Sequence, residues 1–206
     1  MRCGWVLGWA VERAWFADEA RRAWPGAEHL LIDAAPDWRE RLVEAGPLDR
    51  LGGYSLGTLL LLRERDWVAA RWPRVGLLAP IWAFPAEVGR GGRISRAQLR
   101  LLGRWLRHDG ERARREFGAM AGLPREALTS AAAPETLAWG LEQLESVTAA
   151  PGLPAGWFAA GGTADALCDA AVLARAEPGV GWIADAGHAP GAFLRAWAAA
   201  ETGMAG

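Results

Sequence analysis

Short apolar runs alternate along the chain with longer segments in which apolar residues recur at helical spacing. The apolar runs predict strands at residues 3–7, 30–32, 51–54, 75–79, 156–160 and 180–184. The helical spacing predicts helices at residues 12–23, 38–45, 56–71 and 166–175. Because the strands do not alternate polar with apolar positions, we expect helices on both faces of one mainly parallel sheet of about six strands, an α/β fold.

Residues 85–150 interrupt this alternation. The segment opens with a glycine-rich stretch at 89–92, continues with two or three predicted helices and contains no convincing strand. It lies between the fourth and fifth predicted strands. We therefore predict a helical lid inserted into a single domain that spans residues 1–206, a length that fits one domain comfortably.

The composition is that of a globular protein, with 51% hydrophobic and 23% charged residues and a formal net charge of −1. The overall charge gives no reason to expect a nucleic-acid partner. No stretch approaches the roughly 18 apolar residues of a membrane span. The N-terminus lacks the longer apolar run and the cleavage site of a secretory signal. We expect a cytoplasmic protein without a membrane partner.

Two cysteines, Cys3 and Cys168, are too few for a disulfide framework and lack the spacing of metal ligands. We expect both thiols to be reduced and no metal to be bound.

The candidate chemistry begins at residues 53–57, which read Gly-Tyr-Ser-Leu-Gly, a G-x-S-x-G sequence. In this motif a sharp strand-to-helix turn exposes the serine oxygen at the top of the sheet, and the glycines let the two backbones approach closely. The context agrees, because a strand-like run enters the motif at Leu51 and a leucine-rich helix follows it. The N-terminus of that helix favours negative charge that develops near the serine. Ser55 is the candidate nucleophile.

A serine hydroxyl is a poor nucleophile until a base accepts its proton. The chain has three histidines. His29 precedes the second predicted strand, at the edge usually opposite an active site, and His108 falls in the lid. His188 follows the last predicted strand, which places it at the same carboxyl edge as Ser55. We interpret His188 as the base, although an ordinary loop histidine would fit the same position.

The third member of such a site is a carboxylate that orients the imidazole. With a G-x-S-x-G nucleophile the chain order is serine, acid, histidine. Asp165 follows the fifth predicted strand and is our choice for the acid. Asp169, one helical turn later, is the second choice. Asp185 lies only three residues before His188, and a surface position would explain either of these two alternatives.

An oxyanion needs backbone donors. The N–H of Leu56 is one candidate, because it directly follows the nucleophile. The second donor normally comes from the loop after an early strand, which here contains Trp9. The Trp9 side chain also fits simple core packing.

Together these pieces resemble the α/β-hydrolase superfamily. Within it the chain looks most similar to the esterases of biotin synthesis that remove the methyl group from pimeloyl-acyl-carrier-protein methyl ester. The resemblance rests on Gly8-Trp9, on the motif at 53–57, on Gly162-Thr-Ala-Asp165 and on Gly187-His-Ala-Pro190. It implies Ser55 as nucleophile, Asp165 as acid, His188 as base, and Trp9 and Leu56 as oxyanion donors. The chain departs from fuller members of this family in lacking a histidine before Gly8, in a shorter N-terminal sheet and in its lid sequence.

The lid carries a set of arginines that fall within about 60° on a helical wheel. On the other side of the wheel lie apolar residues, so one face packs on the core and the arginines face outward. An acidic acyl-carrier protein would suit this arginine face, because guanidinium groups form directed hydrogen bonds with carboxylates and phosphates. A merely solvated face is the alternative. The arginines are Arg93, Arg96, Arg100, Arg104 and Arg107, and the apolar residues are Leu99, Leu101, Leu102, Trp105 and Leu106.

Three aromatic residues, Trp82, Phe84 and Trp139, are candidates for lining an apolar acyl channel, with plain core packing as the alternative.

We therefore expect an ester hydrolase that works by two-step acyl transfer, needs no cofactor and acts as a monomer on a small acyl ester. A thioesterase or a general small-ester carboxylesterase would use the same three residues. A non-catalytic binding protein on the same fold is the alternative from another class.

Overall fold

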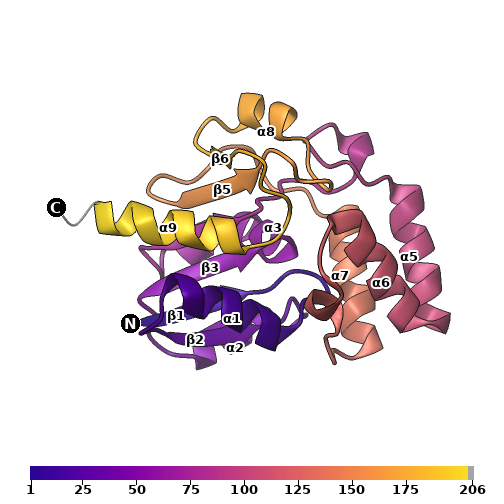
Figure 1. The fold of residues 1–206 in the computed structure, drawn as a ribbon, viewed down its shortest axis with the longest axis horizontal. Coiled ribbons are helices and arrows are strands. Elements are labelled where there is room, and N and C mark those ends of the chain that lie inside the picture. Colours follow the sequence, from indigo (N-terminus) through magenta and orange to yellow (C-terminus); the bar gives the residue numbers. More distant parts are fainter. Residues whose placement is uncertain (204–206) are drawn as a thin grey trace.

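The computed structural model describes residues 1–203 and contains one six-stranded, fully parallel sheet in the order β2-β1-β3-β4-β5-β6 (Figure 1). The predicted strands are all present, with ends shifted by two residues or fewer. The predicted parallel α/β architecture is confirmed. The strands are β1 (Arg2–Val6), β2 (Glu28–Ile32), β3 (Arg50–Tyr54), β4 (Val75–Leu78), β5 (Phe158–Gly162) and β6 (Gly181–Ile183).

The direction of winding reverses beside β1, which lies between β2 and β3. Such a reversal leaves a crevice between the carboxyl ends of β1 and β3, and open α/β sheets bind their ligands in such crevices. The loops that follow these strands carry Trp9 and Ser55. The sheet order therefore brings both candidate residues to one crevice.

Helices cover both faces of the sheet. Successive strand residues point to opposite faces, and a Cβ built on Gly52 would meet Trp5 and Trp197, whereas one on Gly53 would meet Leu61. Helix α9 (Gly191–Gly203), which carries Trp197, therefore lies on the face opposite α3 (Leu56–Arg63). Helix α1 (Arg13–Ala23) packs beside α9. Helix α2 (Trp38–Glu44) follows β2 along the chain and also contacts it.

Two glycines let α9 dock directly on the sheet backbone. Gly52 and Gly76 are neighbours in the register of β3 and β4. A Cβ at Gly52 would lie 2.3 Å from the Trp5 ring, and one at Gly76 would lie 2.4 Å from the Trp197 ring. The Trp197 ring also stacks on Phe158, with centroids 5.8 Å apart. This close packing seats α9, which follows the loop that carries His188, directly on the sheet.

The segment between β4 and β5 contains helices and stands beyond the carboxyl ends of the strands, at the right of Figure 1. A capping box between Ser95 and Gln98 starts the first long helix, and Gly122, at φ 63°, ends the second. We call this segment the lid. Its elements are η1 (Ala86–Val88), α5 (Arg96–His108), α6 (Gly110–Ala121), η2 (Arg125–Leu128) and α7 (Pro134–Ser146).

Two helix predictions differ from the structure, and one helix was missed. The helix predicted at 56–71 is two helices, α3 and α4 (Arg65–Ala69), because the backbone of Glu64 leaves helical geometry at φ −104° and ψ 26°. The helix predicted at 166–175 begins later, as α8 (Ala170–Ala176), where the Asp169 side chain caps it. Helix α9 was not predicted at all.

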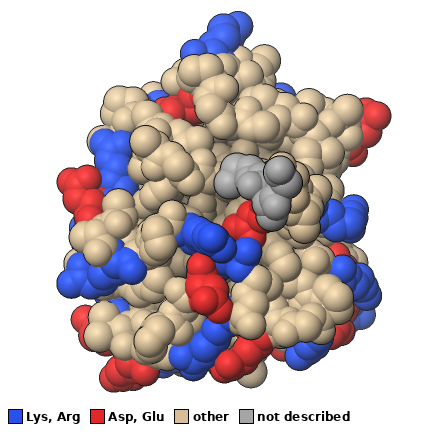
Figure 2. Space-filling view, turned by 90° about the vertical axis from the view of Figure 1, so that its left-hand side faces the viewer, with Lys and Arg blue, Asp and Glu red and all other residues tan. Residues whose placement is uncertain are grey.

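Within residues 1–203, no helix combines the length and the apolar character that crossing a membrane requires. On the face at the amino ends of the strands, arginines and carboxylates lie interspersed (Figure 2).

Candidate active site

Ser55 occupies a strained turn between β3 and α3. Its backbone has φ 54° and ψ −116°, a region that residues with a side chain rarely adopt. The turn is tight because Gly57 lies against β1, where an added Cβ would be 2.0 Å from the carbonyl oxygen of Val6. The G-x-S-x-G sequence thus forms the sharp turn that its glycines suggested.

The structure brings Ser55, His188 and Asp165 into one hydrogen-bonded chain. His188 Nε2 lies 2.9 Å from Ser55 Oγ, and Nδ1 of the same ring lies 2.7 Å from Asp165 Oδ2. The exposed fractions of the three residues are 4% for Ser55, 2% for His188 and 3% for Asp165. Water therefore competes little for these hydrogen bonds.

Asp165 is held as an ionised acceptor. Its Oδ1 accepts the backbone N–H of Leu167 at 2.8 Å. Burial opposes ionisation, but the charge and hydrogen bond of His188, with the N–H groups of Leu167 and Cys168, lower the pKa of Asp165 from its ordinary value. This arrangement suits a carboxylate that orients an imidazole and stabilises its protonated form.

The two alternative acids serve other purposes. The Asp169 carboxylate accepts the N–H groups of Ala171 and Val172 at the start of α8. Asp185 is exposed, and its backbone N–H donates to the Thr163 hydroxyl. Asp165 is the carboxylate that contacts the His188 ring.

The other histidines lie away from Ser55. His29 is in β2, where its Nδ1 accepts the indole N–H of Trp5 at 3.1 Å and its Nε2 lies 3.3 Å from the carbonyl oxygen of Trp24. Burial lowers the pKa of His29, which favours its neutral form. His108 is exposed at the C-terminal end of α5.

Two backbone N–H groups are free to stabilise an oxyanion. Leu56 is the first residue of α3, so its N–H has no acceptor within that helix. Among the hydrogen bonds of residues 1–203, the backbone N–H of Trp9 has no acceptor. The loop that contains Trp9 lies against the nucleophile, since a Cβ on Gly8 would be 3.1 Å from Ser55 Cβ.

Helix α7 of the lid covers these donors. The Trp9 indole N–H donates to the carbonyl of Leu137 at 2.8 Å, and the Trp9 ring meets Phe117 of α6 edge-on at 4.9 Å. A Cβ on Gly140 would lie 2.7 Å from Trp9 and 3.3 Å from the Leu56 side chain. The lid therefore closes directly over the candidate oxyanion site.

Arg93 does not belong to the predicted arginine face of the lid helix. Helix α5 begins at Arg96, after the Ser95 cap, so Arg93 precedes it. The Arg93 guanidinium lies 3.5 Å from the backbone oxygen of Asp165 and 3.6 Å from the Asp169 carboxylate. The prediction of one helical stripe that includes Arg93 is wrong, because the capping box starts the helix later.

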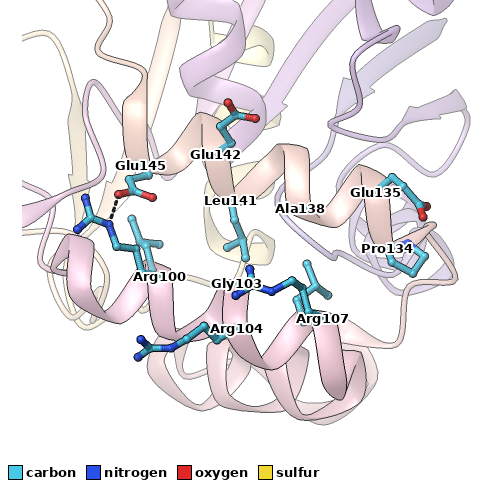
Figure 3. Close-up of a pocket in the computed structure, with 12 residues that line it drawn as sticks. Arg100, Gly103, Arg104, Arg107, Pro134, Glu135, Ala138, Leu141, Glu142 and Glu145 are labelled. Atoms are coloured by element: carbon cyan, nitrogen blue, oxygen red, sulfur yellow. Dashed lines mark hydrogen bonds and ion pairs between the residues drawn. The ribbon is translucent and has the colours of Figure 1, made fainter.

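The other four arginines, Arg96, Arg100, Arg104 and Arg107, are exposed on α5. Arg100 forms an ion pair with Glu145 of α7, with Nε and Oε1 2.7 Å apart. Arg104 and Arg107 line a groove of about 530 Å³ between α5 and α7, into which Leu141 points (Figure 3).

The predicted channel aromatics lie on two elements. Trp82 and Phe84 follow β4 and are fully buried. Trp139 of α7 is partly exposed and lines a separate surface pocket with Trp38. Their contact with an acyl chain stays a prediction.

Sequence reasoning missed two groups that support the strained turn at Ser55 and the loop of His188. The Thr58 hydroxyl donates to the carbonyl of Ser55 at 2.6 Å and accepts the N–H of Ile81 at 2.9 Å. The Tyr54 hydroxyl donates to the carbonyl of His188 at 3.0 Å. Their only sequence signal is their position in and just after the G-x-S-x-G motif.

Within residues 1–203, no group of three or more His, Cys, Asp or Glu side chains is arranged to hold a metal ion.

No family model and no curated protein matches the chain. Solved structures do. A thermophilic esterase from Thermogutta terrifontis has 15% identity and a TM-score of 0.62, and the match covers 100% of this chain and 89% of that one. A carboxylesterase from Bacillus subtilis has 15% identity and a TM-score of 0.56, with 98% and 80% covered. The bottromycin epimerase BotH, in complex with bottromycin A2, has 18% identity and a TM-score of 0.64, with 99% and 89% covered.

These similarities show that the chain has the α/β-hydrolase fold. They show the fold alone, since the identities are low and the similar structures include an epimerase as well as esterases.

Proposed function

We propose that the protein is a serine hydrolase that cleaves a carboxylic ester. The observation that carries this proposal is the hydrogen-bonded chain Ser55–His188–Asp165, which starts at a strained turn and is almost fully buried. Strain of this kind persists only where the surrounding structure enforces it, and it is concentrated at functional sites. The similarity in fold to esterases supports the same reaction class.

Each residue has a defined step in the proposed reaction. Ser55 Oγ attacks the ester carbonyl carbon while His188 Nε2 takes the hydroxyl proton. The carbonyl oxygen becomes an anion that the N–H groups of Leu56 and Trp9 stabilise. Asp165 holds the ring and stabilises the imidazolium, which then protonates the departing alcohol.

The second half of the reaction regenerates the enzyme. Water loses a proton to His188 and attacks the acyl group on Ser55, and the imidazolium returns that proton to Ser55 Oγ as the carboxylic acid leaves. The chemistry uses only these protein groups and water.

Covalent labelling tests this proposal. A fluorophosphonate probe is expected to label the wild-type protein. Mass spectrometry of the peptides after proteolysis is expected to place the adduct on Ser55. The Ser55→Ala variant serves as the matched control and is expected to remain unlabelled. A folded wild-type protein that resists the probe, or equal labelling of both proteins, would favour the non-catalytic binding protein instead.

The substrate we propose is the methyl ester of pimeloyl-acyl-carrier protein, which would place the enzyme in biotin synthesis in the cytoplasm. Three observations support it: the sequence resemblance at the motif and its flanking loops, the buried aromatic residues after β4, and the charge of the lid. Residues 93–126 hold nine arginines and four acidic residues, and the whole lid, residues 86–146, holds ten arginines and eight acidic residues, whereas the whole chain has a net charge of −1. An acidic carrier protein would be attracted to such a surface.

Charge reversal tests the carrier. Arg104→Glu and Arg107→Glu are expected to raise KM for a carrier-linked methyl ester and to leave KM for a free methyl ester unchanged. Arg175→Glu, an equal charge change on the exposed surface of α8, is the control. Equal effects on carrier-linked and free esters would contradict carrier docking. Faster cleavage of thioesters than of matched esters would favour a thioesterase.

A further inference from the structure

Tyr54 connects the nucleophile to the base. It is the only tyrosine in the chain, it ends β3, and it directly precedes Ser55. Its side chain is fully buried, and its hydroxyl donates to the backbone carbonyl of His188 at 3.0 Å. One residue on the β3 strand therefore holds the backbone of another that is 134 positions away.

This hydrogen bond acts at the histidine itself. In residues 1–203, the Tyr54 hydroxyl is the one donor that reaches the carbonyl of His188. The other contacts of the loop hold earlier positions, where Ala164 N–H donates to Ala186 at 2.9 Å and Asp185 N–H donates to Thr163 at 3.0 Å. Without the Tyr54 hydroxyl, the His188 carbonyl would lose its partner in a buried place.

The Tyr54 ring is confined on both sides. Its centroid lies 5.4 Å from the His188 ring and 5.6 Å from the Phe16 ring. Burial, with a smaller effect from the Asp165 charge, raises the pKa of Tyr54 well above its ordinary value. The hydroxyl therefore stays protonated and available as a donor.

We propose that Tyr54 is a positioning residue that fixes the distance between the His188 imidazole and Ser55 Oγ. The inference rests on the proposed function and adds a residue to its site. The ring of His188 has two supports, Asp165 at Nδ1 and Tyr54 through the backbone. Because Tyr54 is bonded covalently to Ser55, this second support ties the base to the same turn that holds the nucleophile.

Tyr54→Phe removes the hydroxyl and keeps the ring. We expect kcat for a free methyl ester to fall by about 10- to 100-fold, since a small misplacement of a catalytic group has effects of this size. KM is expected to stay unchanged, and the rate of fluorophosphonate labelling is expected to fall by the same factor as kcat. A folded Tyr54→Phe protein with wild-type kcat would overturn the inference.

Phe16→Leu is the matched control, because Phe16 packs on the Tyr54 ring without contacting His188 through a hydrogen bond. Loss of packing alone would slow both variants alike, whereas loss of positioning slows Tyr54→Phe far more. Equal reductions in kcat would overturn the positioning role.

A measurement on the otherwise wild-type protein covers the case in which Tyr54→Phe does not fold. Because the chain has one tyrosine, 3-fluorotyrosine labels this site alone. The fluorine resonance is expected to shift over the same pH range in which esterase activity rises. A resonance that stays constant while activity titrates would contradict the connection to His188. Absence of fluorophosphonate labelling in the wild type would instead defeat the proposed function, a separate outcome.

Discussion

The indole N–H of Trp9 donates to the carbonyl of Leu137, 2.8 Å away. This hydrogen bond joins the loop after β1 to the first turn of α7, and the side chain that makes it belongs to the residue whose backbone N–H is a candidate oxyanion donor. Closure of the lid and the position of that donor are therefore coupled through one residue. An open lid would leave the oxyanion loop without this support.

Trp9→Phe should loosen the lid. The substitution keeps an aromatic ring near Phe117 and removes the hydrogen bond, which is worth about 0.5–1.5 kcal/mol. We expect faster limited proteolysis between residues 129 and 137 and a lower kcat/KM for ester substrates. Trp67→Phe, a similar change at a tryptophan that packs on Trp38 and Trp72, is the control. Unchanged proteolysis in Trp9→Phe would show that the lid does not depend on this bond.

Replacing Ser55 should separate stability from activity. Both Ser55→Ala and Ser55→Gly remove the nucleophile and should lower kcat by roughly 10⁴- to 10⁶-fold. Because glycine adopts φ near 54° without strain, Ser55→Gly should be more stable than Ser55→Ala by about 1 kcal/mol. Urea unfolding of the two variants measures this difference. Equal stability would mean that the turn carries no strain.

Asp165 and Asp169 should respond differently to the same substitution. Asp165→Asn is expected to lower kcat by roughly 10³- to 10⁴-fold, because the amide favours the wrong tautomer of His188. Asp169→Asn retains a good helix cap and should change kcat and stability little. Steady-state kinetics on both variants decides the matter. A larger loss of kcat in Asp169→Asn would reverse the assignment of the acid.

The lowered pKa of Asp165 makes a prediction about acid stability. A carboxyl group whose pKa is lower in the folded than in the unfolded protein stabilises the fold above the unfolded value, here 3.8. That stabilisation is lost as the pH falls through the folded pKa. The free energy of unfolding should therefore fall more steeply below about pH 4 in the wild type than in Asp165→Asn. Parallel curves for the two proteins would contradict the lowered pKa.

Much of the fold follows from local pattern. Strands that are buried on both faces are continuous apolar runs, and the sharp turn at Ser55 needs glycines at fixed positions. The break of the predicted helix at Glu64 and the late start of α8 depend on tertiary contacts that spacing does not encode. Arg93 illustrates the same limit at the site. Its role depends on the Asp165 loop, which is distant in sequence, so a helical wheel placed it on the wrong element. Tyr54 and Trp9 support the site through backbone carbonyls that any residue could supply.

The contact between α9 and the sheet backbone at Gly52 and Gly76 has a consequence for biosynthesis. Helix α9, whose Trp197 covers this part of the sheet, leaves the ribosome after all six strands. Before α9 is made, α1 and Trp5 cover only part of this apolar face, and Gly76 has neither a side chain of its own nor the Trp197 ring over it. Chaperone contact during translation should concentrate on this face, and the protein reaches its native state only once α9 has emerged from the exit tunnel.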